Sequence, residues 1–278
     1  MTPDDAFACF RRLMLCELPA DMRLGLYLAF YRTFGVAAIG GLLLATGEST
    51  NRPRRRADDT GLLMYTMFYY GFEHPDGIAA VRRLRGLHRR FTISNDDYLY
   101  VLACLAVVPS RWTDRHGRRR LTDDERTATA AFYLKLGQQL GIAGVPQTYA
   151  AFEEWFDAAD RRRLRPHPAG PPLMQATRGL LVARLPRWLR PAAGRCVDAL
   201  LDQRLRHALD VPEPGWAVRA TVSLLLRVRR QVARLRPPAD QPSFTPGQAV
   251  HSYPHGYRVD QLGPPDTGDR RATLTADS

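Results

Sequence analysis

The chain has 278 residues, 45% of them hydrophobic, a composition that excludes an intrinsically disordered protein and predicts a sizeable core. Forty basic and 28 acidic residues give a net charge of +12 at pH 7, but Lys135 is the only lysine, and this arginine skew is as typical of a GC-rich coding sequence as of phosphate binding. Many arginines stand beside acidic residues on the expected helix surfaces, so no specific nucleic-acid partner is predicted.

The cysteines and the N-terminus indicate a reducing compartment. Cys9, Cys16, Cys104 and Cys196 form no C-x-x-C pair, so neither a disulfide scaffold nor a zinc site is predicted. The N-terminus lacks the basic start and the small-residue cleavage site of a secretory signal, and we expect a cytoplasmic protein.

The most apolar stretch, residues 24–46, has about the length of a membrane span. Arg32 and the glycines that follow it interrupt this stretch, which leaves an uncharged run shorter than the roughly 18–20 residues that a spanning helix needs. A buried core helix is therefore the favoured interpretation, with peripheral contact at a membrane surface as the alternative.

Apolar residues recur at helical spacing, whereas hairpin-turn signals and sustained strand-like alternation are lacking, so we predict an all-α fold, a multi-helix globular bundle. Ser94 precedes Asp97, and Thr122 precedes Glu125, at the three-residue spacing of a capped helix start. Residues 74–77 (HPDG) predict a helix break. The expected helices span residues 4–16, 21–32, 33–46, 60–73, 77–91, 96–108, 122–140, 148–159, 173–184, 192–208 and 214–236.

Two shifts in composition divide the chain. Residues 161–172 are basic and then proline-rich, as in a linker, and little apolar content follows Pro237. Tyr253, His255 and Tyr257 in this last stretch are expected to be solvated, with packing on the helical body as the alternative. The predicted divisions are a helical core, residues 1–165, further helices that pack on it, residues 166–236, and a disordered proline-rich tail, residues 237–278.

The residues around the 74–77 break predict a helical hairpin. Thr60 is expected to open the first arm, and His88 lies near the end of the second. Fourteen residues separate Thr60 from the start of the break, and fourteen more lead to His88, so antiparallel arms of about 20 Å return His88 to the level of Thr60. Arg56 shares a face with Thr60 if the helix begins by Arg56. From spacing alone, a lone histidine here is more often structural than a metal or haem ligand.

At these residues the chain resembles the MpaB-type oxygenases and, more distantly, the latex-clearing proteins, which form one superfamily of haem b oxygenases. The resemblance covers about residues 20–160 and rests on several blocks in the family's order. The blocks are residues 31–35 (YRTFG) with 42–47 (LLLATG), 56–60 (RADDT), 87–88 (LH), 93–100 (ISNDDYLY), 109–112 (PSRW), 119–125 (RRLTDDE), and 137–142 with Pro146.

The resemblance implies a haem b in a pocket enclosed by the helices, with the His88 imidazole as the axial iron ligand. Arg56 and Thr60 match the family's distal motif and are implied to bind the haem, because a guanidinium and a hydroxyl donate hydrogen bonds to bound oxygen or to a propionate. Together with Asp59 they are the implied catalytic residues. The residues themselves leave open a charged helix N-terminus for Arg56 and Asp59, and a capping hydroxyl for Thr60.

Asp59 brings the chain closer to the MpaB-like branch, because latex-clearing proteins carry a lysine at this position. A buried carboxylate needs a partner, and we expect Arg55 or Arg56 to supply it. No counterpart of the catalytic glutamate of the rubber-cleaving branch is found, so rubber itself is a poor candidate substrate.

The implied function is haem-dependent oxygenation, in which O2 cleaves or oxygenates an apolar alkene such as a terpenoid or another secondary metabolite. Two alternatives stay open. One is hydroxylation or peroxide-driven oxidation of a small aromatic metabolite at the same haem. The other is a haem-free helical protein that docks on an anionic surface, although a solvated helix face with a buried Trp188 is favoured over such docking. The residues expected to dock on such a surface are Trp188, Arg184, Arg187, Arg190 and Arg195. The residues expected to line the haem pocket are Met64, Met67 and Phe68, with Leu102 or Cys104. Core packing is the alternative for the pocket residues.

Overall fold

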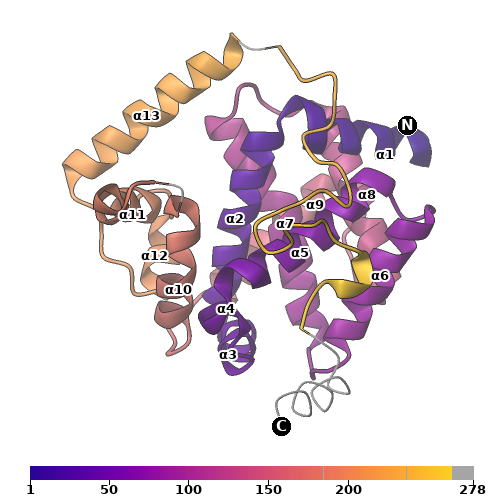
Figure 1. The fold of residues 1–278 in the computed structure, drawn as a ribbon, viewed down its shortest axis with the longest axis horizontal. Helices are drawn as coiled ribbons and strands as arrows, with labels where there is room; N and C mark the ends of the chain where they lie inside the picture. Colours follow the sequence, from indigo (N-terminus) through magenta and orange to yellow (C-terminus); the bar gives the residue numbers. More distant parts are fainter. Residues whose placement is uncertain (184, 236, 265–278) are drawn as a thin grey trace. The chain divides into compact units, whose positions relative to one another are not determined.

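The computed structural model describes residues 1–183, 185–235 and 237–264. Across these ranges the chain forms thirteen α-helices and no strand beyond isolated bridges, which confirms the all-α class (Figure 1). The α-helices are α1 (Pro3–Arg12), α2 (Pro19–Phe34), α3 (Ala37–Ala45), α4 (Glu48–Asn51), α5 (Pro53–Tyr70), α6 (Pro75–His88), α7 (Asn95–His116), α8 (Asp123–Leu140), α9 (Tyr149–Arg163), α10 (Gly170–Val182), α11 (Arg190–Asp198), α12 (Gln203–Ala208) and α13 (Trp216–Arg234). A π-helical turn, η1 (Leu13–Glu17), and two 3₁₀ turns, η2 (Arg187–Leu189) and η3 (Val259–Gln261), complete the chain.

Both predicted capping residues lie at helix starts. The Ser94 hydroxyl accepts a hydrogen bond from the backbone N–H of Asp97 at 3.1 Å, at the start of α7. The Thr122 hydroxyl accepts from the N–H of Glu125 at 3.2 Å, and the Glu125 carboxylate accepts from the N–H of Thr122 at 2.8 Å. These bonds satisfy amides that the first turn of a helix leaves without a partner, which explains why the sequence locates these helix starts well.

Two predicted boundaries are corrected. The first arm of the hairpin begins at Pro53 rather than at Thr60, because a proline suits the first turn of a helix, where its missing N–H is not needed. Helix α7 continues through Pro109 to His116 instead of ending at residue 108. An internal proline removes one helical hydrogen bond. The buried face of α7, including Cys104 and Trp112, compensates for that loss by packing in the core.

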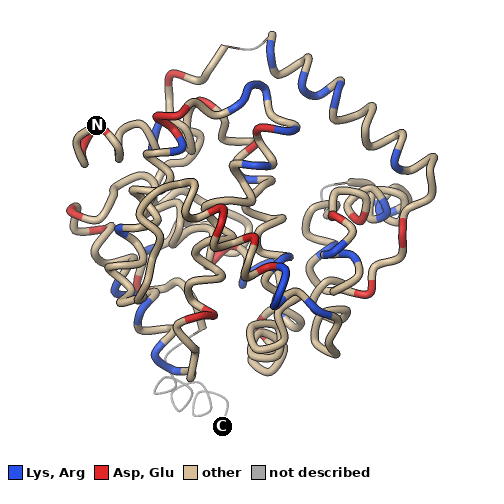
Figure 2. The backbone as a smooth tube through the Cα atoms, turned by 180° about the vertical axis from the view of Figure 1, so that it is seen from behind, with Lys and Arg blue, Asp and Glu red and all other residues tan. Residues whose placement is uncertain are grey.

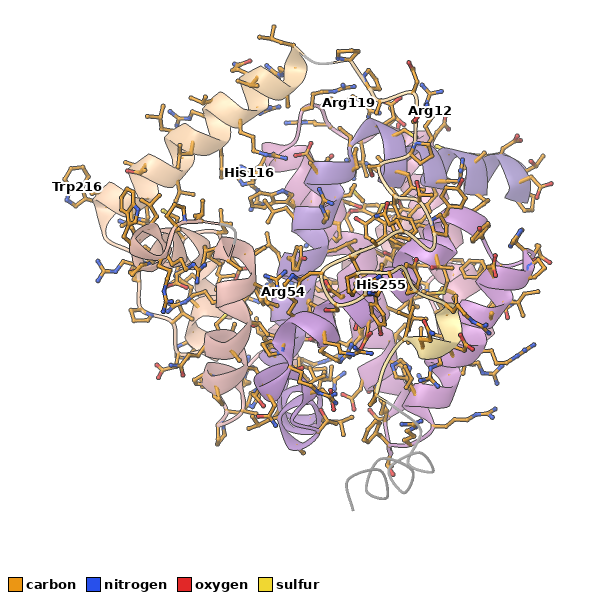
Figure 3. All side chains as sticks on the ribbon, viewed as in Figure 1. Arg12, Arg54, His116, Arg119, Trp216 and His255 are labelled. Atoms are coloured by element: carbon orange, nitrogen blue, oxygen red, sulfur yellow. The ribbon has the colours of Figure 1, made fainter. Side chains whose placement is uncertain are left out.

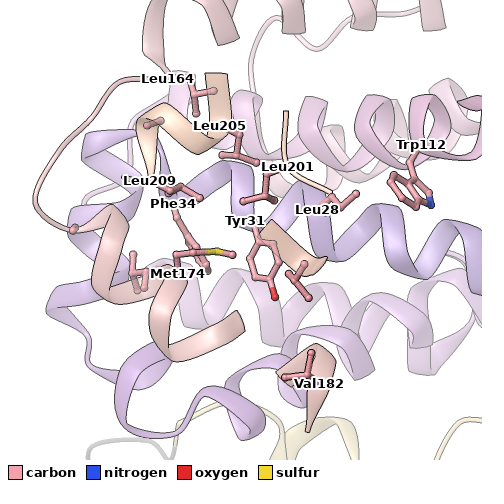
Figure 4. Packing of buried hydrophobic residues seen from close by; sticks show 14 residues of the cluster. Leu28, Tyr31, Phe34, Trp112, Leu164, Met174, Val182, Leu201, Leu205 and Leu209 are labelled. Carbon is pink, nitrogen blue, oxygen red and sulfur yellow. The ribbon is translucent and has the colours of Figure 1, made fainter. Parts of the chain in front are cut away.

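The chain divides into two compact units. Unit 1 comprises residues 1–54 and 93–243, and unit 2 comprises residues 55–92 together with the chain from residue 244 onward. The helices that follow the predicted boundary at residue 165 pack within unit 1. Leu173 and Met174 of α10, for example, share a buried cluster with Tyr31 and Phe34 of α2 (Figure 4).

Helices α2 and α7 pack closely in unit 1, and Gly25 permits their contact. A Cβ atom at position 25 would lie 2.4 Å from the Cα atom of Pro109, which is too close for any side chain. We therefore expect Gly25→Ala to force the helices apart and to lower the free energy of unfolding by about 1–3 kcal/mol or more. Urea denaturation measures the loss. Gly41→Ala is the control, because nothing lies within 4 Å of a Cβ atom there.

A largely buried ion cluster ties four helices of unit 1 together. The Arg32 guanidinium on α2 donates to both carboxylate oxygens of Asp160 on α9, at 2.7 and 3.0 Å. It also donates to Asp202, the N-cap of α12, at 2.5 Å. The Tyr100 hydroxyl on α7 donates to Asp160 at 2.8 Å. Arg32 belongs to the YRTFG block, and the structure assigns this residue to the packing of unit 1.

The prediction of disorder from residue 237 onward is wrong for residues 237–264, whereas residues 265–278 lie outside the described residues. Residues 239 and 243 bond to η1 within unit 1, and residues 244–264, called here the C-terminal segment, pack in unit 2. Phe244, Tyr253, Tyr257 and Leu262 are buried there. A few large side chains anchor this segment without regular structure, and its prolines reduce the entropy that ordering must overcome.

Candidate functional site

Helices α5 and α6 of unit 2 flank the predicted break and are joined by the turn of residues 71–74 (Figure 1). Gly71 takes the left-handed conformation that ends α5, with φ +74°. The Nδ1 atom of His74 then accepts from the N–H of Asp76 at 3.2 Å and caps α6. Gly77, the last residue of the predicted break, lies inside α6. A glycine is required at this position, because a Cβ atom there would lie 1.8 Å from the Gly71 carbonyl oxygen.

His88 is the last residue of α6, and its imidazole is partly buried. Burial, and then the positive charge of Arg56, lower the pKa of His88 from 6.5 to about 4. The ring is therefore neutral at pH 7, which is the state that a metal ligand requires. The charge of Arg56, near the start of α5, thus acts on the ring at the end of α6.

Acidification is expected to destabilise the cofactor-free protein through His88. Because the folded-state pKa of about 4 lies below the ordinary value of 6.5, the unfolded chain takes up the proton first, and stability is lost as the pH falls through this window. His88→Gln, which does not titrate, should lose less thermal stability than the wild type between these two pH values. Equal losses in both proteins would contradict a buried, neutral ring.

The other two predicted site residues, Asp59 and Thr60, follow Arg56 on α5. The Thr60 hydroxyl donates to the Arg56 carbonyl oxygen at 2.9 Å, so Thr60 is bound within α5 and does not cap a helix start. Asp59 is 5% exposed, and its carboxylate accepts a hydrogen bond from the hydroxyl of Tyr253. The structure thus turns Asp59 toward the C-terminal segment, whereas Arg56 acts on His88 through its charge.

Tyr253 is the partner of Asp59 that the sequence did not reveal. Either Arg55 or Arg56 was expected to pair with Asp59. Arg55 contacts Tyr253 instead, donating to the hydroxyl at 3.1 Å with its guanidinium carbon 4.6 Å from the ring centroid. Burial and the Asp59 carboxylate raise the pKa of Tyr253, which keeps the phenol protonated as a donor. The expectation that Tyr253 and Tyr257 are solvated is therefore wrong, since both are buried.

The C-terminal segment also contacts α6 beside His88. The Arg83 side chain donates to the Leu262 carbonyl oxygen at 2.7 Å. Gly263 lies so close to Leu87 that a Cβ atom at position 263 would be 2.8 Å from the Leu87 side chain. Since Tyr253 holds the same segment to Asp59 of α5, the segment joins both arms of the hairpin at the end where Arg56 and His88 lie.

Tyr253→Phe should release this connection. It removes the hydrogen bond to the buried Asp59 carboxylate, at an expected cost of about 1–3 kcal/mol in the stability of unit 2. Hydrogen exchange across residues 244–264 should accelerate. Ser252→Ala is the matched control, because the Ser252 hydroxyl donates to the more exposed Asp58, and its loss should have a smaller effect. Equal exchange in Tyr253→Phe and the wild type would refute the anchoring role.

A pocket of about 470 Å³ lies in unit 2 toward the turn of the hairpin. Its lining comes from Thr66 and Tyr70 of α5, Asp76 and Ala79 of α6, and residues 246, 247 and 257–260 of the C-terminal segment. The five apolar residues expected to line a haem pocket, Met64, Met67, Phe68, Leu102 and Cys104, are all buried, and none lines this pocket. Their burial agrees with core packing, which was the alternative interpretation of these residues.

In the described ranges, no group of three or more His, Cys, Asp and Glu side chains is arranged to hold a metal ion. Haem iron takes its equatorial ligands from the porphyrin and needs only an axial ligand from the protein. The neutral imidazole of His88, with the Arg56 cation near it, is a donor set that fits a haem and its anionic propionates.

Across the described helices, none has the length and apolarity needed to cross a bilayer.

Comparison with known proteins decides the family. The family model described as "ER-bound oxygenase mpaB/B'/Rubber oxygenase, catalytic domain" matches residues 19–236, which is most of the chain. The chain belongs to the mpaB and rubber oxygenase family. The resemblance seen in the sequence blocks is thereby confirmed. The matched region contains Arg56, Asp59, Thr60 and His88 and ends before the C-terminal segment begins.

Individual mpaB proteins are also similar to the chain. The ER-bound oxygenase mpaB' of Penicillium brevicompactum is 29% identical over 259 residues, covering 86% of this chain and 61% of that protein. The mpaB of the same species is 26% identical, covering 86% and 59%. The mpaB of Penicillium roqueforti (strain FM164) is 26% identical, covering 75% and 76%. The chain thus spans about three-fifths of the length of the first two mpaB relatives.

Proposed function

We propose that this chain is a haem b-dependent oxygenase that uses O2 to cleave or oxygenate an apolar alkene. The observation that carries the proposal is the neutral His88 imidazole beside Arg56, within the region that matches the oxygenase family. When bound, the haem supplies the activation of O2, and the protein supplies its binding and surroundings. The word "rubber" in the family description names a polyalkene, which supports an alkene as the substrate class.

The side chains near the start of α5 have separate roles in this proposal. The His88 imidazole would hold the haem iron through a ring nitrogen, and its pKa near 4 keeps that nitrogen unprotonated at physiological pH. The Arg56 guanidinium would hold an anionic group of the haem, such as a propionate. Thr60 is the second donor, available once its hydroxyl turns from the Arg56 carbonyl. Asp59 acts as a positioning residue, since its carboxylate binds Tyr253.

The optical spectrum of the purified full chain tests the proposal. Protein expressed with ample haem supply should show a Soret band and a pyridine haemochrome typical of haem b. Cleavage of a model terpenoid alkene under ¹⁸O2 should place label in both carbonyl products. A protein that takes up no haem under these conditions would refute the proposal. Label in a single hydroxyl group would favour hydroxylation, and turnover with peroxide alone would favour peroxide-driven oxidation.

A further inference from the structure

Helix α13 of unit 1 carries an unusual concentration of exposed apolar side chains. In the described residues, eleven large hydrophobic side chains are exposed, and six of them lie on α13 or at its C-cap. Trp216 at the N-terminal end is 78% exposed and points outward in Figure 3. The six are Trp216, Leu224, Leu225, Val228, Val232 and Leu235. Scattered exposed apolar residues are normal, but a set on a single helix marks an interaction surface.

The exposed apolar side chains of α13 are not those that attach the helix to unit 1. Val222 is buried, and Leu226 packs against the buried cluster of Figure 4. At about 100° per residue, Leu224, Val228 and Val232 fall on a different side of the helix from these two residues. The stripe formed by Leu224, Leu225, Val228 and Val232 is called here the outer stripe.

The charge on α13 has one sign. Five arginines and no acidic residue lie between residues 216 and 234, and Figure 2 shows only basic positions along the helix. Arg229 pairs with Asp21 of α2, and Arg219 pairs with Glu213 just before the helix. Arg227 and Arg234 are exposed on the side of α13 next to the outer stripe.

A second exposed tryptophan lies just before α11, a helix that contacts α13. Trp188 of η2 is 77% exposed, so the expectation that it is buried is wrong. Helix α11 contacts both η2 and α13. Of the arginines grouped with Trp188 in the sequence analysis, Arg190 donates to the backbone carbonyls of residues 183 and 185. Arg184 lies outside the described residues.

We propose that α13 docks this protein on the surface of an anionic phospholipid bilayer, with the outer stripe in the interface and Trp216 at the headgroup level. Apolar residues on one side with arginines beside them are the pattern of helices that lie in the plane of a membrane. The arginine side chains extend past the apolar surface to reach lipid phosphates, and tryptophan favours the headgroup region.

The charge of α13 decides between this occupant and two others. A second copy of the chain, paired through the same stripe, would bring two sets of arginines together with no acidic residue on either helix to offset them. Nucleic acid would attract the arginines but would leave the exposed leucines and valines in water. An anionic bilayer accommodates both the arginines and the apolar side chains of α13, because its phosphates face the arginines and its acyl chains face the outer stripe.

Vesicle binding by the full chain tests the proposal. Wild-type protein should sediment with vesicles of phosphatidylcholine containing phosphatidylserine, less with phosphatidylcholine alone, and less again at high salt. Leu224→Gln/Val228→Gln should weaken binding about tenfold, since burial of two apolar side chains is lost while the net charge is unchanged. Ser223→Gln is the control on another exposed side of α13, about 100° from Leu224, and it should bind as the wild type does.

The remaining arms of the experiment separate lipid from the other occupants. Arg227→Gln/Arg234→Gln should reduce the preference for phosphatidylserine without changing the circular dichroism of the protein. Equal sedimentation of the outer-stripe variant and the wild type would overturn the proposal. So would a dimer of wild-type protein that becomes monomeric in the outer-stripe variant, because a second copy would then cover the stripe.

Discussion

His88→Ala is expected to purify without the Soret band that the wild type shows. Alanine removes the one imidazole that the hairpin brings beside Arg56, and the four porphyrin nitrogens alone do not attach the iron to the protein. Absorbance at the Soret maximum, normalised to protein concentration, should fall at least about tenfold, since losing even a supporting contact around a metal costs about 10–100-fold in affinity. Circular dichroism of the two proteins should coincide.

The control for this result is His255→Ala, which removes an exposed histidine from the same unit. It should retain full haem content. Addition of imidazole to His88→Ala during reconstitution should restore part of the Soret band, because free imidazole can occupy the vacated position. A His88→Ala protein with haem content equal to that of the wild type would show that another residue holds the iron.

Arg32→Met is expected to give the largest loss of stability in unit 1. The change leaves the Asp160 carboxylate, whose side chain is 6% exposed, with the Tyr100 hydroxyl but without its cation. Removing one partner of a buried ion pair costs about 3–5 kcal/mol, because the remaining charge is not solvated. The midpoint of urea denaturation measures the effect, and the intrinsic tryptophans report unfolding.

Two further variants test the cause of that loss. Arg52→Met breaks an exposed pair with Glu48 one turn away and should cost less than about 1 kcal/mol. Asp160→Asn in the Arg32→Met background should recover part of the stability, since it removes the uncompensated charge. If the double variant loses as much stability as Arg32→Met and Asp160→Asn lose separately when their losses are added, Arg32 and Asp160 do not act as a pair.

Local features of the chain were predicted where short-range chemistry determines them. The caps at Ser94 and Thr122 and the break before Pro75 each depend on a side chain within a few residues of the amide that it serves. The equal spacing on each side of that break predicts that His88 returns to the level of Thr60, because helix geometry converts residue number into length, and this stays a prediction. The oxygenase family was also recognisable from blocks of sequence.

Contacts between distant residues were not predictable in this way. Asp59 and Tyr253 are 194 residues apart, and Arg32 and Asp160 are 128 apart, so neither pairing has a local signal. The proline-rich composition after residue 237 predicts disorder, yet four buried side chains order that segment through contacts that composition does not describe.

By itself the sequence determined the all-α class, the ends of several helices and the family, because periodicity, capping and the order of motifs act along the chain. Tertiary structure alone decided that Asp59 binds Tyr253, that Arg32 joins three helices and that the outer stripe of α13 stays exposed. The physical reason is that burial depends on which distant surfaces meet, and a residue's own neighbours in sequence do not specify that meeting.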